Sequence, residues 1–209
     1  MIEYVIEESI DKRSLKKAVD ILNSGGLVAY PTDSSWSLGC SAFSSSGLDK
    51  LKKLKGKEPF VPTLLCSEIS QISEFVQLQN GPFKIIKKLI PGPYVFILEP
   101  HHFLEKKMGI KRLELGIRIP SHKVPRALID LLGHPLFSIT ASKKMTEEGW
   151  WDSVFAEENL FEYGYEVEDI PSIQMVLDTG EPLPKYLTTV ISLKDDTPEL
   201  LRQGIGIWE

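Results

Sequence analysis

The 209-residue chain has only two cysteines, Cys40 and Cys66, so it cannot form a framework of several disulfides. Both lie in apolar surroundings beside expected strands, which predicts reduced thiols in the core of a cytosolic protein. The chain also lacks an apolar run near the ~18 residues needed to cross a bilayer. Residues 1–8 are acidic and alternating, unlike a signal peptide. We therefore expect a cytoplasmic protein with no membrane partner.

An excess of positive charge is missing as well. The chain has 24 lysines and arginines against 29 aspartates and glutamates, a formal net charge of −5. No global basic field can attract nucleic acid, so any site for a polyanion must be a local patch. The hydrophobic content of 42% and charged content of 25% are typical of a globular protein. We expect a single domain over residues 1–209.

A turn rich in hydroxyl groups is the most distinctive stretch that is present. Val28-Ala29-Tyr30 reads as a buried strand that ends at Pro31, because a residue before proline prefers extended geometry. Four small polar residues follow at positions 32–35, namely Thr32, Asp33, Ser34 and Ser35. They cannot form a core, but they can present donors and acceptors to a ligand from a strand end. An ordinary solvated turn is the alternative.

Strands and helices alternate through the first two-thirds of the chain, and strands cluster at its end. A helix capped by Ser14 and a second one capped by Ser46, with Asp49 at capping-box spacing, are expected early on. Residues 143–170 read as a loop-plus-helix excursion packed by its own aromatic side chains. The pattern predicts an α/β (α+β) fold, a twisted mixed parallel and antiparallel sheet with flanking helices.

Cations and hydroxyls recur where the expected strands and helices end. Lys55 and Lys57 flank Gly56 at a helix end, where two ammonium groups could converge on one phosphate. Arg118 lies inside an apolar strand, so it is either an edge residue or an anion ligand. In open α/β sheets such ends line the ligand crevice. Further candidates of this kind follow other strands: Thr140, Ser142, Thr188, Thr189 and Arg202.

Several stretches, in order, resemble the YrdC-like family, whose best-known members are threonylcarbamoyl-AMP synthases. The resemblance covers nearly the whole chain and rests on five elements that are strong together and weak singly. These elements are Tyr30-Pro31-Thr32-Asp33-Ser34 with Leu38-Gly39, Lys55-Gly56-Lys57, Pro91-Gly92-Pro93-Tyr94, Gly116-Ile117-Arg118-Ile119-Pro120, and the closing Thr188-Thr189-Val190-Ile191 with Leu201-Arg202-Gln203-Gly204.

The resemblance implies the YrdC/RibB-like fold with a concave, positive cleft. Family enzymes use ATP, L-threonine and bicarbonate to make threonylcarbamoyl-adenylate and pyrophosphate, for modification of adenosine 37 in certain tRNAs, and Mg²⁺ is expected with ATP. Some members have been described as binding double-stranded RNA. Carried over to this chain, the resemblance assigns catalysis to Lys55, Lys57 and Arg118; threonine or carbamate to Thr32, Ser34, Arg118 and Thr188; and the nucleotide to Lys55, Lys57, Thr140, Ser142 and Arg202.

The chain departs from the family pattern at several of these positions. Ser142 replaces the asparagine of a Ser-x-Asn element, Lys57 replaces an arginine, and Trp36 replaces a tyrosine. The tail Asp195-Asp196-Thr197-Pro198, with Asp33-Ser34, resembles the YciO branch more than the synthases. Two hypotheses stay open: a threonylcarbamoyl-AMP synthase, or a YciO-type protein that binds nucleotide or RNA (tRNA or double-stranded RNA) with little synthase activity. A purely structural role for these residues is the third.

Overall fold

The computed structural model describes residues 1–56, 61, 63–104, 114–146, 157–195 and 197–209. Within these ranges ten strands form one sheet in the order β1-β8-β2-β3-β7-β4-β6-β5-β9-β10. Their bounds are β1 (Ile2–Tyr4), β2 (Leu27–Tyr30), β3 (Ser37–Ser41), β4 (Thr63–Leu65), β5 (Tyr94–Leu98), β6 (Leu115–Arg118), β7 (Leu136–Thr140), β8 (Ile173–Asp178), β9 (Thr189–Ser192) and β10 (Glu199–Arg202).

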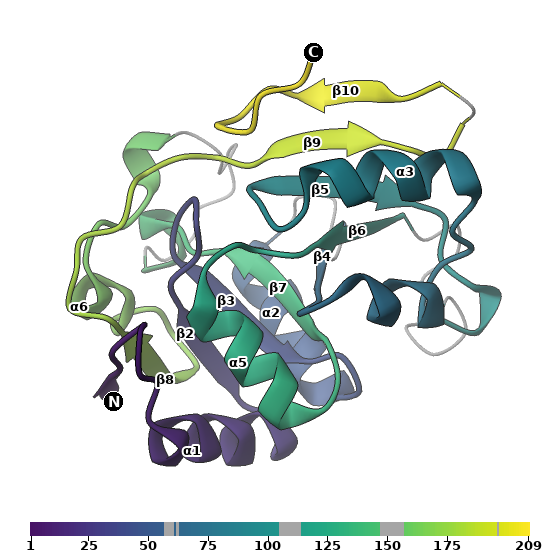
Figure 1. Cartoon of the computed structure of the whole chain (residues 1–209). Coiled ribbons are helices and arrows are strands. Elements are labelled where there is room, and N and C mark those ends of the chain that lie inside the picture. The colour runs from purple at the N-terminus through teal and green to yellow at the C-terminus, as the bar shows by residue number, and fades with distance from the viewer. Residues whose placement is uncertain (57–60, 62, 105–113, 147–156, 196) are drawn as a thin grey trace.

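Both parallel and antiparallel pairs occur along this sheet. Parallel pairs join β1 to β8, β8 to β2, β4 to β6 and β5 to β9, and the other neighbours are antiparallel. The mixed sheet with flanking helices that the sequence predicts is confirmed (Figure 1). The helices are α1 (Lys12–Asn23), α2 (Ser45–Lys55), α3 (Asn80–Leu89), α5 (Lys123–Leu132) and α6 (Gly164–Val167), with 3₁₀ turns η1 (Ile69–Glu74), η2 (Lys143–Thr146) and η3 (Glu157–Asn159).

Alternate residues of the strands face two separate apolar clusters. On one face, Val28, Leu136 and Met175 pack with side chains of α1 and α5. On the other, Leu38, Phe137 and side chains of α2, α3 and α6 form the larger cluster. Figure 1 shows α1 and α5 together over β2, β3 and β8, whereas β4, β6, β5 and β9 extend beyond them. The outer part of the sheet therefore lies beyond α1 and α5.

Two expected helix starts are wrong by two or three residues. Asp11 caps α1 by accepting a hydrogen bond from the Arg13 N–H at 2.9 Å, whereas Ser14 is buried in the helix and donates to Glu3. Ser44, not Ser46, caps α2. In both cases a neighbouring oxygen reaches the free N–H groups of the first turn better, and local sequence spacing cannot distinguish the competitors.

The aromatic excursion is corrected in part. Its residues 147–156, with Trp150, Trp151 and Phe155, lie outside the described residues. Phe161 does not pack within the segment alone but joins the main core, and the indole of Trp36 donates to the Glu162 carbonyl at 3.3 Å. Tyr163 and Tyr165 stack on each other at the surface. This part of the chain is therefore tied to the sheet through its core side chains.

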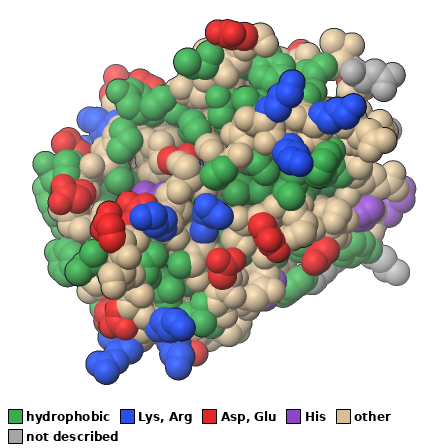
Figure 2. Space-filling view, in the orientation of Figure 1, with side chains coloured by type: hydrophobic (Ala, Val, Ile, Leu, Met, Phe, Trp, Pro, Cys, Tyr) green, Lys and Arg blue, Asp and Glu red, His purple; other side chains and the backbone are tan. Residues whose placement is uncertain are grey.

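Neither cysteine is in a disulfide, and both are buried. Burial raises the pKa of Cys40 to about 12 and raises that of Cys66 further, so both stay protonated near neutral pH. None of the helices in the described ranges has the length and apolar character to cross a bilayer. On the face seen in Figure 2, acidic and basic side chains are interspersed, as the small net charge leads one to expect.

Candidate active site

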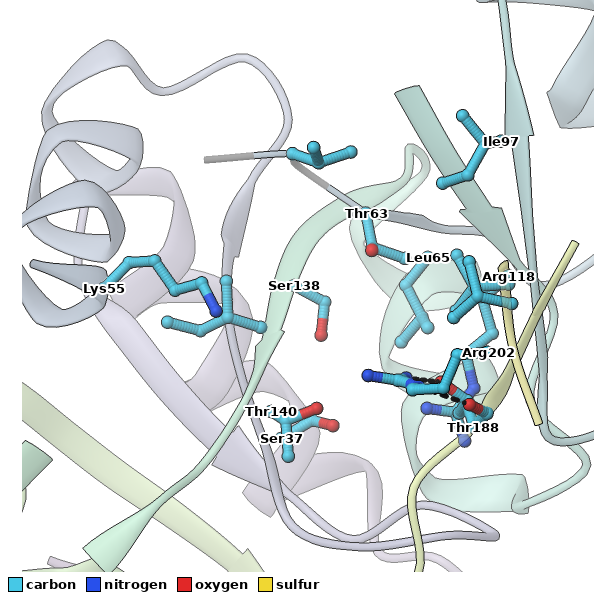
Figure 3. A pocket seen from close by; sticks show the side chains of 14 residues that line it. Ser37, Lys55, Thr63, Leu65, Ile97, Arg118, Ser138, Thr140, Thr188 and Arg202 are labelled. Carbon is cyan, nitrogen blue, oxygen red and sulfur yellow. Dashed lines mark hydrogen bonds between the residues drawn. The ribbon is translucent and has the colours of Figure 1, made fainter. Parts of the chain in front are cut away.

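A cavity of about 250 Å³ lies on the α1/α5 face of the sheet, beyond the helices. Its floor consists of side chains from β3, β7, β4, β6, β5, β9 and β10, and Lys55 reaches it from the end of α2 (Figure 3). Leu65 connects the two regions, because it packs in the α1/α5 cluster and also lines the cavity. The cavity thus continues the face that the helices leave open.

The strand register explains which side chains reach the floor. Thr140 lies opposite Ser37, and Ser138 lies between Gly39 and Thr63 in neighbouring strands. Residues separated by two along a strand share a face, so these hydroxyls all point to the cavity side. Two residues beyond Thr63 on β4, Leu65 pairs with Arg118 of β6. The floor therefore combines a hydroxyl-bearing half with a guanidinium.

Arg118 is held by the turn that follows β2. It is 5% exposed, and its Nη2 donates to Thr32 Oγ1 at 3.2 Å, Asp33 Oδ1 at 2.7 Å and Ser34 Oγ at 2.9 Å. This ion pair solves the problem of an arginine inside an apolar strand, since a buried charge needs a hydrogen-bonded partner. The Nε of Arg118 and the Oδ2 of Asp33 are buried and have no hydrogen-bond partner among the described residues.

The turn is itself organised around Thr32. Its Oγ1 accepts from the backbone N–H groups of Ser34 and Ser35, both at 3.3 Å, and donates to the Ser35 carbonyl at 2.6 Å. The turn is therefore rigid before any ligand arrives, which is what a preorganised binding site requires. Thr32 and Ser34 reach the cavity through Arg118 rather than by lining it.

Two further cations face the same space. Arg202 on β10 donates from Nε to the Thr188 carbonyl at 3.0 Å and from Nη2 to Thr188 Oγ1 at 2.9 Å, the dashed bonds of Figure 3. Burial, and then the charge of Arg118, lower the pKa of Arg202. The two guanidinium groups therefore repel each other, and with Lys55 in the same cavity an anion would relieve that repulsion.

Of the residues assigned through the resemblance, the structure brings most together. Lys55, Arg118, Thr140, Thr188 and Arg202 line the cavity, and Thr32 and Ser34 contact Arg118. Ser142 does not line it; its Oγ is buried and has no hydrogen-bond partner in the described part of the chain. Lys57 lies outside the described residues.

Three lining residues had no role assigned from the sequence: Ser37, Thr63 and Ser138. The signal that could have found them is the strand alternation, because Ser138 shares a face with Thr140 and Ser37 shares one with Gly39. Thr63 could not be found this way, since its neighbour in the sheet is decided by the strand order. Asp33 belongs to the motif after β2, but its pairing with Arg118 was not predicted from the sequence.

The donor set of this cavity does not fit a resident magnesium ion. Its lining contains lysine, arginine and hydroxyl groups but no carboxylate among the described residues, and these contain no cluster of three His, Cys, Asp or Glu side chains suited to a metal. Protein-bound Mg²⁺ takes carboxylate oxygens, usually together with phosphate oxygens of the substrate. The cavity is therefore built for anions.

Comparison with known sequences gives a consistent result. The profile of the Sua5/YciO/YrdC family, described as "Telomere recombination", matches residues 20–204. The uncharacterized protein YciO of Escherichia coli is 30% identical over 211 aligned residues, covering 97% of this chain and 95% of YciO. Threonylcarbamoyl-AMP synthase of Mus musculus is 32% identical over 130 residues, which cover 62% of this chain and 46% of the synthase.

Solved structures extend the likeness to the fold. The crystal structure of E. coli YciO superimposes with a TM-score of 0.83 at 28% identity, over 99% of this chain and 97% of YciO. The crystal structure of P. abyssi Sua5 complexed with L-threonine gives a TM-score of 0.78 at 23% identity, over 98% of this chain and 57% of Sua5. At that identity the likeness to Sua5 concerns the fold alone.

Proposed function

Because the chain belongs to the Sua5/YciO/YrdC family, we propose that it is a nucleotidyltransferase of the threonylcarbamoyl-AMP synthase type. In this reaction the amine of L-threonine combines with bicarbonate to give a carbamate and water. A carbamate oxygen then attacks the α-phosphorus of ATP, and the bond to the β-phosphate oxygen breaks. The products are threonylcarbamoyl-adenylate and pyrophosphate, the former a precursor for adenosine-37 modification in tRNA.

The observation that carries the proposal is the convergence of Lys55, Arg118 and Arg202 on one hydroxyl-lined cavity in an acidic protein. ATP and bicarbonate are anions, and L-threonine carries a carboxylate beside its ammonium group. Nucleotidyl transfer depends on positioning and on neutralising the developing charge more than on covalent help from the protein. Preorganised cations supply both, because they are already oriented before the reaction begins.

We assign a separate role to each cation and hydroxyl of the cavity from its place in the lining. Arg118, at the junction with the Thr32–Ser34 turn, binds the carboxylate or the carbamate of the amino acid. Arg202 and Lys55 bind phosphate oxygens, and Thr140 and Thr188 donate hydrogen bonds to the same anions. Lys57 is proposed to add a further cation, and Ser142 a hydroxyl. Mg²⁺ enters as the MgATP substrate, held by phosphate oxygens and water.

The direct test incubates the purified chain with ATP, L-threonine, bicarbonate and Mg²⁺, and measures released pyrophosphate. We expect release that requires all three substrates. An active synthase serves as the positive control, and omission of L-threonine as the negative control. The absence of pyrophosphate beside an active control would refute the proposal.

A second candidate is a nucleotide- or RNA-binding protein with little synthase activity. The observation that favours it is Ser142, whose short buried hydroxyl has no partner among the described residues where synthases have an asparagine. The full-length similarity to YciO agrees with it. In this case binding to double-stranded RNA or tRNA should weaken as salt rises, and Lys55→Ala should flatten that dependence. Affinity that does not change with salt would exclude it.

A further inference from the structure

One buried hydrogen bond ends at Ser138, a residue of the cavity lining, and determines what the Ser138 hydroxyl can do. Tyr30, on β2, donates from its phenol to Ser138 Oγ on β7 at 2.9 Å. The strand β3 runs between these two strands, so the phenol ring must pass over it. Gly39 of β3, directly opposite Ser138, makes this possible: a Cβ at that position would lie 2.5 Å from Tyr30 Oη. A side chain there would displace the ring.

The direction of this hydrogen bond is determined by the surroundings of Tyr30. Its side chain is fully buried in the α1/α5 cluster, among apolar side chains. If the phenol accepted a proton from Ser138 instead, its own proton would be left without an acceptor in that cluster. Burial also raises the pKa of Tyr30, so it keeps its proton. The phenol is therefore a permanent donor.

Ser138 is consequently left with a proton to donate. Its bond from Tyr30 is the one hydrogen bond of its hydroxyl within the described residues, and Ser138 lines the cavity. Donation to the phenol is excluded, because that oxygen is the donor. The cavity is the remaining direction in which the Ser138 proton finds an acceptor, and an occupant that offers none leaves a buried donor unsatisfied.

A second hydroxyl, that of Thr63, lies on the neighbouring strand β4. Gly39, Ser138, Thr63 and Gly116 are neighbours across β3, β7, β4 and β6. The glycines contribute no side chain, and a Cβ at Gly116 would come within 2.9 Å of Thr63 Oγ1. Figure 3 shows Ser138 and Thr63 near each other in the cavity. Ser138 can donate and Thr63 can accept, so a ligand hydroxyl within reach of both side chains can bond to each of them.

We infer that Ser138 donates to the side-chain hydroxyl of the amino-acid substrate and that Thr63 accepts from it, with Tyr30 as the positioning residue. This inference rests on the proposed function, because it presupposes an amino acid in the cavity. It makes Ser138 and Thr63 specificity-determining residues. They select a hydroxyl-bearing side chain over an apolar one of the same shape, because an apolar side chain leaves the proton of the buried Ser138 hydroxyl without an acceptor.

The test compares L-threonine with L-valine, in which a methyl group replaces the hydroxyl. Calorimetric titration of the full chain should show L-threonine bound about tenfold more tightly or better, as one to two hydrogen bonds allow. Ser138→Ala and Thr63→Val should each reduce this preference to about twofold or less. Thermal unfolding of each variant checks that it is folded.

Tyr30→Phe gives the readout that separates positioning from structure. It keeps the ring but frees Ser138 to rotate, so we expect a preference between those of the wild type and Ser138→Ala. The double variant Tyr30→Phe/Ser138→Ala should show the same threonine preference as Ser138→Ala alone, because Tyr30 acts only through the proton of Ser138. Ser192→Ala, which removes a buried hydroxyl of β9 outside the cavity lining, is the matched control and should keep the full preference.

The outcomes distinguish this inference from the function on which it rests. If the wild type binds L-threonine and releases pyrophosphate but Ser138→Ala keeps the threonine preference, only the inference is overturned. If Tyr30→Phe lowers the preference further in the Ser138→Ala background, the positioning role is overturned. If the wild type binds neither amino acid and releases no pyrophosphate, both the proposed function and this inference fail.

Discussion

Arg118 combines a structural and a chemical task in a single side chain. One of its nitrogens serves three oxygens of the Thr32–Ser34 turn, and the same guanidinium faces the cavity. The turn therefore fixes the cation, and the cation neutralises Asp33. A planar fork can hold the turn with one nitrogen and present another to an anion, which a lysine ammonium cannot do in the same geometry.

Arg118→Lys should lower kcat/KM for pyrophosphate release by about 100-fold, the effect of losing one preorganised donor. Steady-state kinetics with threonine as the varied substrate measures this. The matched control is Arg13→Lys, because Arg13 is exposed on α1 and does not line the cavity. A variant with unchanged kcat/KM would show that the guanidinium is not used.

His122 adds a pH dependence to stability. Its Nδ1 accepts from the Val124 N–H at 3.2 Å and so caps α5, with Glu7 3.6 Å away. Burial lowers the pKa of His122 from its ordinary value of 6.5, against the opposite influences of Glu7 and Asp33. The neutral ring is thus favoured in the folded state, because a protonated Nδ1 can no longer accept the capping hydrogen bond.

The sign of the effect follows from proton linkage. As the pH falls below about 6.5 the unfolded chain binds a proton at His122 first, so the contribution to stability decreases and is lost below the folded-state pKa. His122→Asn keeps a capping oxygen and removes the titration. Urea unfolding at a series of pH values should show a shallower decrease on acidification for this variant. An identical slope in both proteins would contradict the role of His122.

At the scale of elements, α2 matters because its last residue is Lys55. The helix begins at Ser45, and Ser44 Oγ accepts from the Gly47 N–H at 3.0 Å. Leu48 and Leu51 on its inner face are buried in the main cluster. The N-cap determines where the helix begins, and Gly56, with a φ of 71°, ends it directly after Lys55, whose ammonium group reaches the cavity.

Ser44→Ala should destabilise the protein by about 1 kcal/mol, the usual effect of removing an N-cap. Ser46→Ala is the matched control, because Ser46 accepts none of the backbone hydrogen bonds that cap α2 in the structure. Its effect should stay within about 0.5 kcal/mol. Chemical denaturation of both variants measures the difference, and a larger loss for Ser46→Ala would reverse the assignment.

At the scale of the whole molecule, the sheet order brings residues from distant parts of the sequence into one cavity. Lys55 comes from the first third of the chain, Arg118 from the middle and Arg202 from the end. A ligand that contacts all three binds only the folded state, so it must raise the stability of the entire domain. Local unfolding of any strand that lines the cavity would remove part of the site.

MgATP at about 100 times its Kd should therefore raise the unfolding free energy by about 2.7 kcal/mol. Thermal unfolding with and without MgATP measures this as a shift in Tm. Arg202→Gln should lose most of the shift, whereas Arg13→Gln should keep it. An equal shift in all three proteins would place nucleotide binding elsewhere than in this cavity.

The predictable part of this protein lies in local patterns. Apolar alternation predicted the mixed sheet and its helices, and the hydroxyl-rich turn after Tyr30 with the arginine strand predicted a polar site at the strand ends. The helix starts at Ser14 and Ser46 were wrong, because several oxygens near each start compete for the same N–H groups. Tertiary packing decides such competition, and local spacing does not report it.

By itself, the sequence determined the fold class, the family and the residue types of the site. Only the tertiary structure decided that Asp33 pairs with Arg118 and that Tyr30 reaches Ser138 across Gly39. These contacts join residues 85 and 108 positions apart in the chain. The physical reason is that alternation reports which face a side chain takes, whereas the strand order decides which side chains become neighbours.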